Sequence, residues 1–221
     1  DLLNEPNFVH GETTSWPALA ERAARAILAI DPSRFIVVSF EAGGSPTYPP
    51  IAPIPLPNLI YTVHMYIVHC FTVRNSFCPS PPFSSQTQHF SQHQGLYGWP
   101  ATETYPTTTL GCWPGKLDKD VLRAALEPAH KFSLRHNMKI VVGEFSAIRW
   151  AFNGSAVRYL EDVIDIFEEY GWHWIYHAFR EADCWSVEYT ENRTNTHPAT
   201  SPTSRQVLLE SRFGMNQNPY I

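Results

Sequence analysis

The chain has 221 residues, of which 16 are basic and 21 acidic, giving a formal charge of −5 at pH 7. It contains no basic run and no apolar stretch as long as a membrane span, so we expect neither nucleic acid nor membrane among its partners. The length suits one large core and nothing marks a linker, so we expect a single domain over residues 1–221.

Apolar strands and amphipathic helices alternate along the chain. A strand is expected to end in Asp1–Pro6, and others are expected over 34–40, 59–66, 139–146 and 172–179. Helices are expected over 16–30, over 118–138, from Ser155 to Gly171 and over about 203–213. Strands that are apolar on both faces are typical of parallel sheets covered by helices. The order predicts a parallel α/β sheet, with carboxylates after its strands as on the rim of a (β/α)8 barrel.

Residues 67–117 form a long segment without periodicity, rich in proline, serine and threonine. A loop of this length in a compact domain is usually functional or partly disordered. Two interpretations of its aromatic residues stay open: the rings stack on sugars, or they fix the loop to the protein surface. The aromatic residues concerned include Tyr97, Trp99, Tyr105 and Trp113.

Two glutamates occupy similar places at the ends of apolar strands. Glu5 ends the segment DLLNEP, and Glu144 ends the buried strand in KIVVGEFS. Hydrolysis of a glycosidic bond needs one carboxyl group to protonate the leaving oxygen and one carboxylate to attack the sugar or activate water. The alternative is that each is an ordinary surface glutamate at a loop edge. We expect the pair to face each other across the mouth of a barrel.

The four cysteines have no metal-type spacing, and the histidines show no ligand spacing either, so no metal site is expected. Cys70 and Cys78 could bridge to each other or to Cys112, and Cys184 belongs to a different loop. Two tripeptides beginning at Asn153 and Asn192 have the form of N-glycosylation sites. We expect an extracellular protein, because polymeric glycans lie outside cells, although no signal peptide is visible in the chain.

The motifs NEP, HMY and GEF, with an aromatic strand and a tryptophan-bearing loop after them, occur in this order. Together they resemble the fourth, sixth, seventh and eighth strands of glycoside hydrolase family 5, the cellulase-type retaining β-glycosidases. The resemblance runs from Asp1 to about Phe213. It implies a (β/α)8 barrel truncated to strands four to eight. Such a remnant would expose apolar inner faces, so we expect self-association or pairing with the N-terminal part.

The resemblance assigns roles to residues at the matching positions. It implies that Glu5 is the general acid/base and Glu144 the nucleophile, with Asn4 holding the sugar 2-hydroxyl group. It also implies that Tyr66 hydrogen-bonds Glu144 and that His64 lines the site near the acid/base. The alternative for His64 and Tyr66 is that they are packing residues at a strand end.

The substrate-binding residues follow from the same resemblance. Trp150 and Trp185 are candidate sugar platforms. The family usually places a tryptophan near the end of its eighth strand, where this chain has His177 and Phe179, so Trp185 is the candidate substitute. The implied activity is that of an endo-acting retaining β-glycanase on β-1,4-glucan, with mannan or another β-glycan as the alternative substrate. A catalytically impaired relative that only binds glycans is the competing hypothesis, and no cofactor is expected.

Overall fold

The computed structural model describes residues 1–7, 15–50, 52–67, 72, 104–108 and 115–215. The chain divides into two compact units, which are treated separately below. The first comprises Asp1–Met65, Leu122–Phe145 and Asp165–Ile175; the second comprises Tyr66–Val121, Ser146–Ile164 and Tyr176–Ile221. The single domain expected over residues 1–221 stays a prediction. No helix in the described part of the chain is long and apolar enough to cross a membrane.

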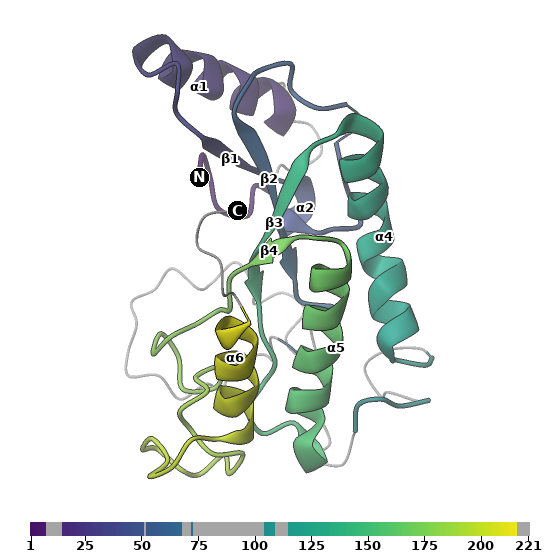
Figure 1. The fold of residues 1–221 in the computed structure, drawn as a ribbon, viewed down its shortest axis with the longest axis vertical. Helices are drawn as coiled ribbons and strands as arrows, with labels where there is room; N and C mark the ends of the chain where they lie inside the picture. Colours follow the sequence, from purple (N-terminus) through teal and green to yellow (C-terminus); the bar gives the residue numbers. More distant parts are fainter. Residues whose placement is uncertain (8–14, 51, 68–71, 73–103, 109–114, 216–221) are drawn as a thin grey trace. The chain divides into compact units, whose positions relative to one another are not determined.

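The first unit is built on a four-stranded sheet (Figure 1). Its strands pair in sequence order, and all three pairs are parallel. This confirms the parallel α/β sheet predicted from the two-sided apolar strands. The strands are β1 (Ile36–Ser39), β2 (Leu59–Met65), β3 (Lys139–Phe145) and β4 (His173–Trp174).

Four long helices lie close to the ranges expected from the sequence, and a short helix follows β1. Asp118 caps α4 by accepting a hydrogen bond from the backbone N–H of Val121 at 3.3 Å, and Thr203 caps α6 in the same way for Gln206 at 3.2 Å. Ser15 stands at the N-cap of α1, where a serine is expected to cap the helix, but its side chain makes no capping bond. The helices are α1 (Trp16–Ile30), α2 (Glu41–Gly44), α4 (Lys119–His136), α5 (Ser155–Glu169) and α6 (Ser204–Gly214).

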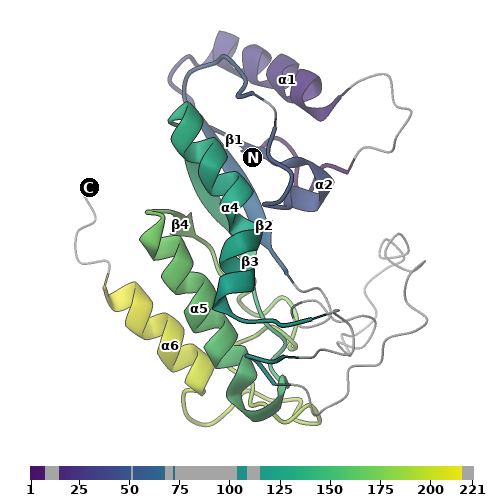
Figure 2. The ribbon, with the colours of Figure 1, turned by 90° about the vertical axis from the view of Figure 1, so that its right-hand side faces the viewer.

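Aromatic side chains attach helices to the sheet in the first unit. Phe132 of α4 packs edge-on against Phe40 and Tyr61, with ring centroids 5.5 and 5.1 Å apart. Phe167 of α5 packs in the same manner against Phe145 of β3, at 5.2 Å. Figure 2 shows α4 running along the strands. These contacts cover Tyr61 of β2 and Phe145 of β3 with helices, and both residues are buried.

Two expected strands are shorter in the structure. The segment Asp1–Pro6 has no strand assignment, although the N–H of Leu2 donates to the carbonyl of Val37 at 3.1 Å. The strand expected over 172–179 is reduced to β4, after which only the N–H of Ile175 still donates to Val142. A strand needs a repeated ladder of backbone hydrogen bonds, and each of these segments at the sheet edge adds a single one.

The second unit contains α6, the first part of α5 and the connecting loops. Tyr105 is fully buried there, its hydroxyl donating to Asp162 at 2.6 Å and its ring 5.5 Å from that of Tyr159. Tyr105 therefore fixes its segment to α5, which favours the anchoring interpretation for this residue. Cys184 is disulfide-bonded. The other expectations for the long segment lie outside the described residues, namely those for Tyr97, Trp99, Trp113, Cys70, Cys78 and Cys112.

Candidate active site

The two predicted catalytic glutamates meet at His64 in the first unit. His64 Nδ1 lies 2.8 Å from Glu5 Oε1 and 3.8 Å from Glu144 Oε1. One oxygen of each carboxylate and the imidazole nitrogen all lie within 4.8 Å of one another. The His64 side chain is 3% exposed, whereas those of Glu5 and Glu144 keep 29% and 19% of their surface. The arrangement gives a buried imidazole with two carboxylates that solvent can reach.

A β-bulge places Glu144 beside His64. Val63 pairs with Val142, but the next pair is His64 with Glu144, so Gly143 is the extra residue in β3. A Cβ atom at Gly143 would collide with Thr62 Oγ1 and would lie 3.2 Å from His64 Nε2. Only glycine lets β3 approach β2 this closely, which explains why glycine precedes the glutamate in the GEF motif.

A second glycine lies close to the imidazole. Gly44 has φ +72°, and a Cβ atom there would lie 3.1 Å from His64 Cγ. At both Gly44 and Gly143, therefore, a larger residue would crowd the His64 ring. Neither residue of the Gly43–Gly44 pair is among the predicted site residues. Paired glycines directly after a buried strand are a signal of close backbone approach that could have identified this role.

The backbone at Glu5 is held in an unusual conformation. Its φ of +49° falls in the left-handed region, which costs a residue other than glycine on the order of 1–3 kcal/mol. The following residue, Pro6, is buried, and its carbonyl accepts a hydrogen bond from Gly43 at 3.3 Å. The turn that presents Glu5 is thus tied to α2, the same short helix that supplies Gly44.

Imidazole nitrogen and carboxylate oxygen are also the atoms that bind metal ions. Within the described residues, Glu5, His64 and Glu144 form the only group of three or more such side chains close enough to share one. A paired-acid site uses the same residue types without a metal, and the direct hydrogen-bond contact between His64 and Glu5 suits that use. The absence of a metal cofactor stays a prediction.

Three of the predicted substrate-binding residues form a cluster in the second unit. The Tyr66 hydroxyl lies 2.9 Å from His177 Nδ1, and the Trp185 ring lies 6.4 Å from the Tyr66 ring and 5.1 Å from the His177 ring. Glu181 Oε2 lies 2.7 Å from His177 Nε2. We call Tyr66, His177 and Trp185 the aromatic cluster. The hydrogen bond expected between Tyr66 and Glu144 stays a prediction.

The remaining predicted residues have different surroundings. Trp150 is half-buried, with the guanidinium groups of Arg149 and Arg193 5.4 and 5.2 Å from its ring centre. Phe179 is 74% exposed and carries Arg180 over its ring. Asn4 is exposed. At the end of the last strand, therefore, His177 and not Phe179 belongs to the aromatic cluster.

The chain matches a family model and several curated relatives. The sequence model described as Cellulase (glycosyl hydrolase family 5) matches residues 1–183. Endoglucanase C of Acetivibrio thermocellus is 27% identical over 173 residues, a match that covers 77% of this chain and 50% of the relative. Endoglucanase C307 of Clostridium sp. (strain F1) matches with the same identity and coverage.

The solved structures of Thermotoga maritima Cel5A are similar in fold. Its complex with cellobiose has a TM-score of 0.64 at 20% identity, covering 95% of this chain and 57% of that one. Its complex with mannotriose has a TM-score of 0.59 at 20% identity, covering 85% and 53%. The likeness confirms the predicted barrel-type fold, and the chain spans about half the length of the curated relatives it matches. Because the family model covers most of its residues, this chain belongs to the cellulase family, glycosyl hydrolase family 5.

Proposed function

We propose that this chain carries the catalytic residues of a retaining endo-β-glycanase that hydrolyses β-1,4-glucan. The observation that carries the proposal is the close approach of the two glutamates: a carboxylate oxygen of Glu5 lies within 4.8 Å of a carboxylate oxygen of Glu144. Retaining glycosidases hold their carboxyl groups about 5–5.5 Å apart, whereas inverting enzymes need about 6.5–9.5 Å to fit a water molecule. The close approach in this chain supports direct attack on the sugar.

The reaction proceeds by two displacements. Glu144 attacks the anomeric carbon while Glu5 donates its proton to the leaving glycosidic oxygen, so the C–O bond breaks as a glycosyl ester forms on Glu144. Glu5, now ionised, then takes a proton from water, whose oxygen displaces Glu144 and releases the sugar with its configuration retained. His64, at 2.8 Å from Glu5 Oε1, orients the acid/base carboxyl group. Asn4 holds the 2-hydroxyl group of the reacting sugar.

The aromatic cluster binds sugar rings of the polysaccharide. Aromatic faces cover the apolar faces of pyranoses, and Tyr66, His177 and Trp185 bring several rings together. Trp150 and Phe179 are further platforms, of which Phe179 is the more exposed. The names of the endoglucanase relatives support glucan as the substrate. The mannotriose complex of Cel5A favours β-mannan as the second candidate.

A covalent trap tests this proposal. The protein is incubated with an activated 2-deoxy-2-fluoro-β-cellobioside, and the intact mass is measured. We expect one adduct per chain, mapping to the peptide that contains Glu144, and no adduct in Glu144→Gln. The manno-configured reagent, used in parallel, decides between glucan and mannan. Folded protein that forms no adduct with either reagent would favour the competing hypothesis of a glycan-binding relative without catalysis.

We also propose that the chain acts outside the cell and that its sheet is covered by another copy or by further chain of the same protein. Val37, Ile60 and Val141 are only half-buried, although they are apolar strand residues. A polysaccharide substrate is found outside cells, which supports secretion. Size-exclusion chromatography of this chain tests the association, because a compact, soluble monomer would contradict it.

A further inference from the structure

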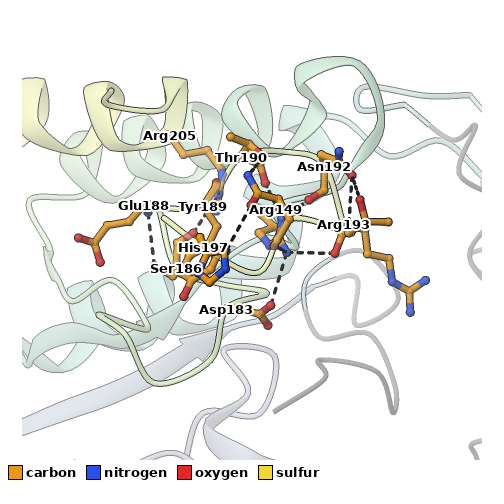
Figure 3. A network of polar contacts seen from close by, with 12 residues as sticks. Arg149, Asp183, Ser186, Glu188, Tyr189, Thr190, Asn192, Arg193, His197 and Arg205 are labelled. Carbon is orange, nitrogen blue, oxygen red and sulfur yellow. Dashed lines mark hydrogen bonds and ion pairs between the residues drawn. The ribbon is translucent and has the colours of Figure 1, made fainter. Parts of the chain in front are cut away.

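Two buried arginines hold one loop of the second unit. Arg149 precedes Trp150 and is 0% exposed, and Arg205 lies in the first turn of α6 and is 1% exposed. Both point into residues 183–195, a loop that follows the last strand and contains Trp185 (Figure 3). Arginine is among the residues least often fully buried, so two in one place need a specific reason.

The Arg149 side chain binds backbone carbonyls in the C-terminal half of the loop, residues 190–195. Its Nη1 donates to the carbonyls of Thr190 and Asn192, both at 2.6 Å. Its Nη2 donates to the carbonyls of Arg193 and Asn195 at 3.3 and 2.8 Å. Four carbonyl oxygens converge on this side chain, and the planar guanidinium supplies several donors at once.

The Arg205 side chain binds backbone carbonyls in the N-terminal half of the loop, which contains Trp185. Its Nη2 donates to the carbonyls of Ser186 and Tyr189 at 2.9 and 2.7 Å, and its Nη1 lies 3.4 Å from the carbonyl of Trp185. The Tyr176 hydroxyl donates to the same Trp185 carbonyl at 2.6 Å. The backbone of Trp185 is therefore fixed by Arg205 of α6 and by Tyr176.

The indole of Trp185 is fixed as well. Its Nε1–H donates to the carbonyl of Thr72 at 2.9 Å, and its ring contacts His177 and Tyr66. Burial lowers the pKa of both guanidinium groups, because removing their charge from water costs free energy. The loop carbonyls offset this desolvation for both arginines, and for Arg149 the Asp183 carboxylate, 3.5 Å from Nη2, adds a favourable charge.

We propose that Arg205 is a positioning residue for substrate binding, acting through Trp185, and that Arg149 completes the same clamp on the loop. The proposal rests on the proposed function, because the bound sugar is the glycan of that reaction. Arg205 itself touches no substrate. Its effect is to keep the Trp185 ring in the aromatic cluster before the polysaccharide arrives, which reduces the entropy that binding must remove.

Hydrogen exchange at the indole of Trp185 tests the placement without any activity. The Nε1–H resonance is assigned by its absence in Trp185→Phe and followed in Arg205→Gln and Arg205→Lys. We expect exchange about tenfold faster in Arg205→Gln, corresponding to about 1.4 kcal/mol, with Arg205→Lys between it and the wild type. The matched control is Arg158→Gln, because Arg158 donates to the carbonyls of Tyr105 and Asn153 and to no residue of the loop.

Steady-state kinetics test the consequence for substrate. For cellopentaose, Arg205→Gln should raise KM about fivefold while kcat stays within about twofold, and Arg158→Gln should change neither. Unchanged exchange at Trp185 in folded Arg205→Gln would overturn the proposal, as would equal acceleration at every tryptophan. If Arg205→Gln does not fold, Arg205→Lys decides by the same criteria. A wild-type protein without hydrolysis would instead refute the glycanase proposal, and the indole exchange would still report whether Arg205 positions Trp185.

Discussion

The two units concentrate polar side chains in opposite ways. In the first unit, Glu5 and Glu144 converge on one imidazole and keep part of their surface exposed. In the second unit, Arg149 and Arg205 are buried, and most of their hydrogen bonds go to backbone carbonyls of one loop. A guanidinium group that is buried against carbonyls organises a loop and does not take part in chemistry. The carboxylates of Glu5 and Glu144 stay partly accessible to solvent, so a reacting group can reach them.

The means of placement also differ. The glutamates stand where the backbone itself is special, at a left-handed residue and after a β-bulge. The arginines reach their acceptors through long side chains from ordinary positions. Backbone placement is rigid and suits groups that must meet a reacting atom within a fraction of an ångström. Side-chain placement suits a loop, whose carbonyls converge only after folding.

Replacing either glutamate should have the largest effect on activity, because in the proposed mechanism only Glu5 and Glu144 react with the substrate. In Glu144→Gln and Glu5→Gln we expect kcat/KM to fall at least about 10³-fold with little change in stability. Initial rates on carboxymethylcellulose and on an activated aryl cellobioside measure the loss. Glu161→Gln, an exposed glutamate on α5, is the control and should keep wild-type rates. Equal loss in the control would show that the assay reports folding and not chemistry.

Replacing Arg149 should affect stability more than any other polar substitution in the second unit. Arg149→Gln leaves several loop carbonyls without a donor, and we expect the free energy of unfolding to fall by about 3 kcal/mol. Urea denaturation followed by tryptophan fluorescence measures it. Arg193→Gln is the comparison, because Arg193 is exposed, and it should change the free energy by no more than about 0.5 kcal/mol. If Arg149→Gln changed the free energy of unfolding only slightly, water would be hydrogen-bonding the loop carbonyls in place of the guanidinium, and the prediction would be wrong.

Gly143→Ala tests whether the bulge holds the site. The added methyl group meets Thr62 and His64, both buried, so we expect the free energy of unfolding to fall by about 1–3 kcal/mol and activity to fall with it. Gly214→Ala is the matched control, because a methyl group there meets no atom within 4 Å and the position ends α6. Thermal unfolding and initial rates are measured together. Wild-type behaviour of Gly143→Ala would mean that β2 and β3 separate easily.

The strands and helices near the centre of the chain could be predicted because their apolar pattern is local. The apolar run in KIVVGEFS predicted β3 to within one residue of its end, and the helix stripes predicted α4 and α5. The first and last strands were overestimated, since a ladder depends on neighbours that a local pattern does not contain. The convergence of Glu5 and Glu144 followed from their common place at strand ends, to which the family resemblance added their separate roles.

The supporting residues could not be predicted in the same way. Gly44 matters because of an imidazole twenty residues further along the chain. Arg149 and Arg205 matter because of carbonyls, which every residue has and which sequence does not distinguish. A buried arginine in a sequence looks like an exposed one until the fold shows what surrounds it. These roles depend on tertiary contacts and carry no periodic signal.

The ion pair of Arg180 and Glu188 should give the smallest effect. Glu188 lies in the loop that Arg149 and Arg205 hold, but the side chains of the pair stay 64% and 21% exposed. Arg180 donates two hydrogen bonds to Glu188, at 2.8 and 2.9 Å, and they lower the pKa of that carboxyl group. A lowered folded-state pKa adds stability that is fully present above the unfolded-state pKa and is lost as pH falls through the folded value. Arg180→Gln should therefore raise the pKa of Glu188 toward its ordinary range and weaken the stability contributed near neutral pH. A carbon-detected NMR titration of Glu188 measures this, with Arg212→Gln as the control. Because exposed pairs are screened by salt, 1 M NaCl should move the wild-type pKa in the same direction, and insensitivity to salt would place the pair with the buried arginines instead.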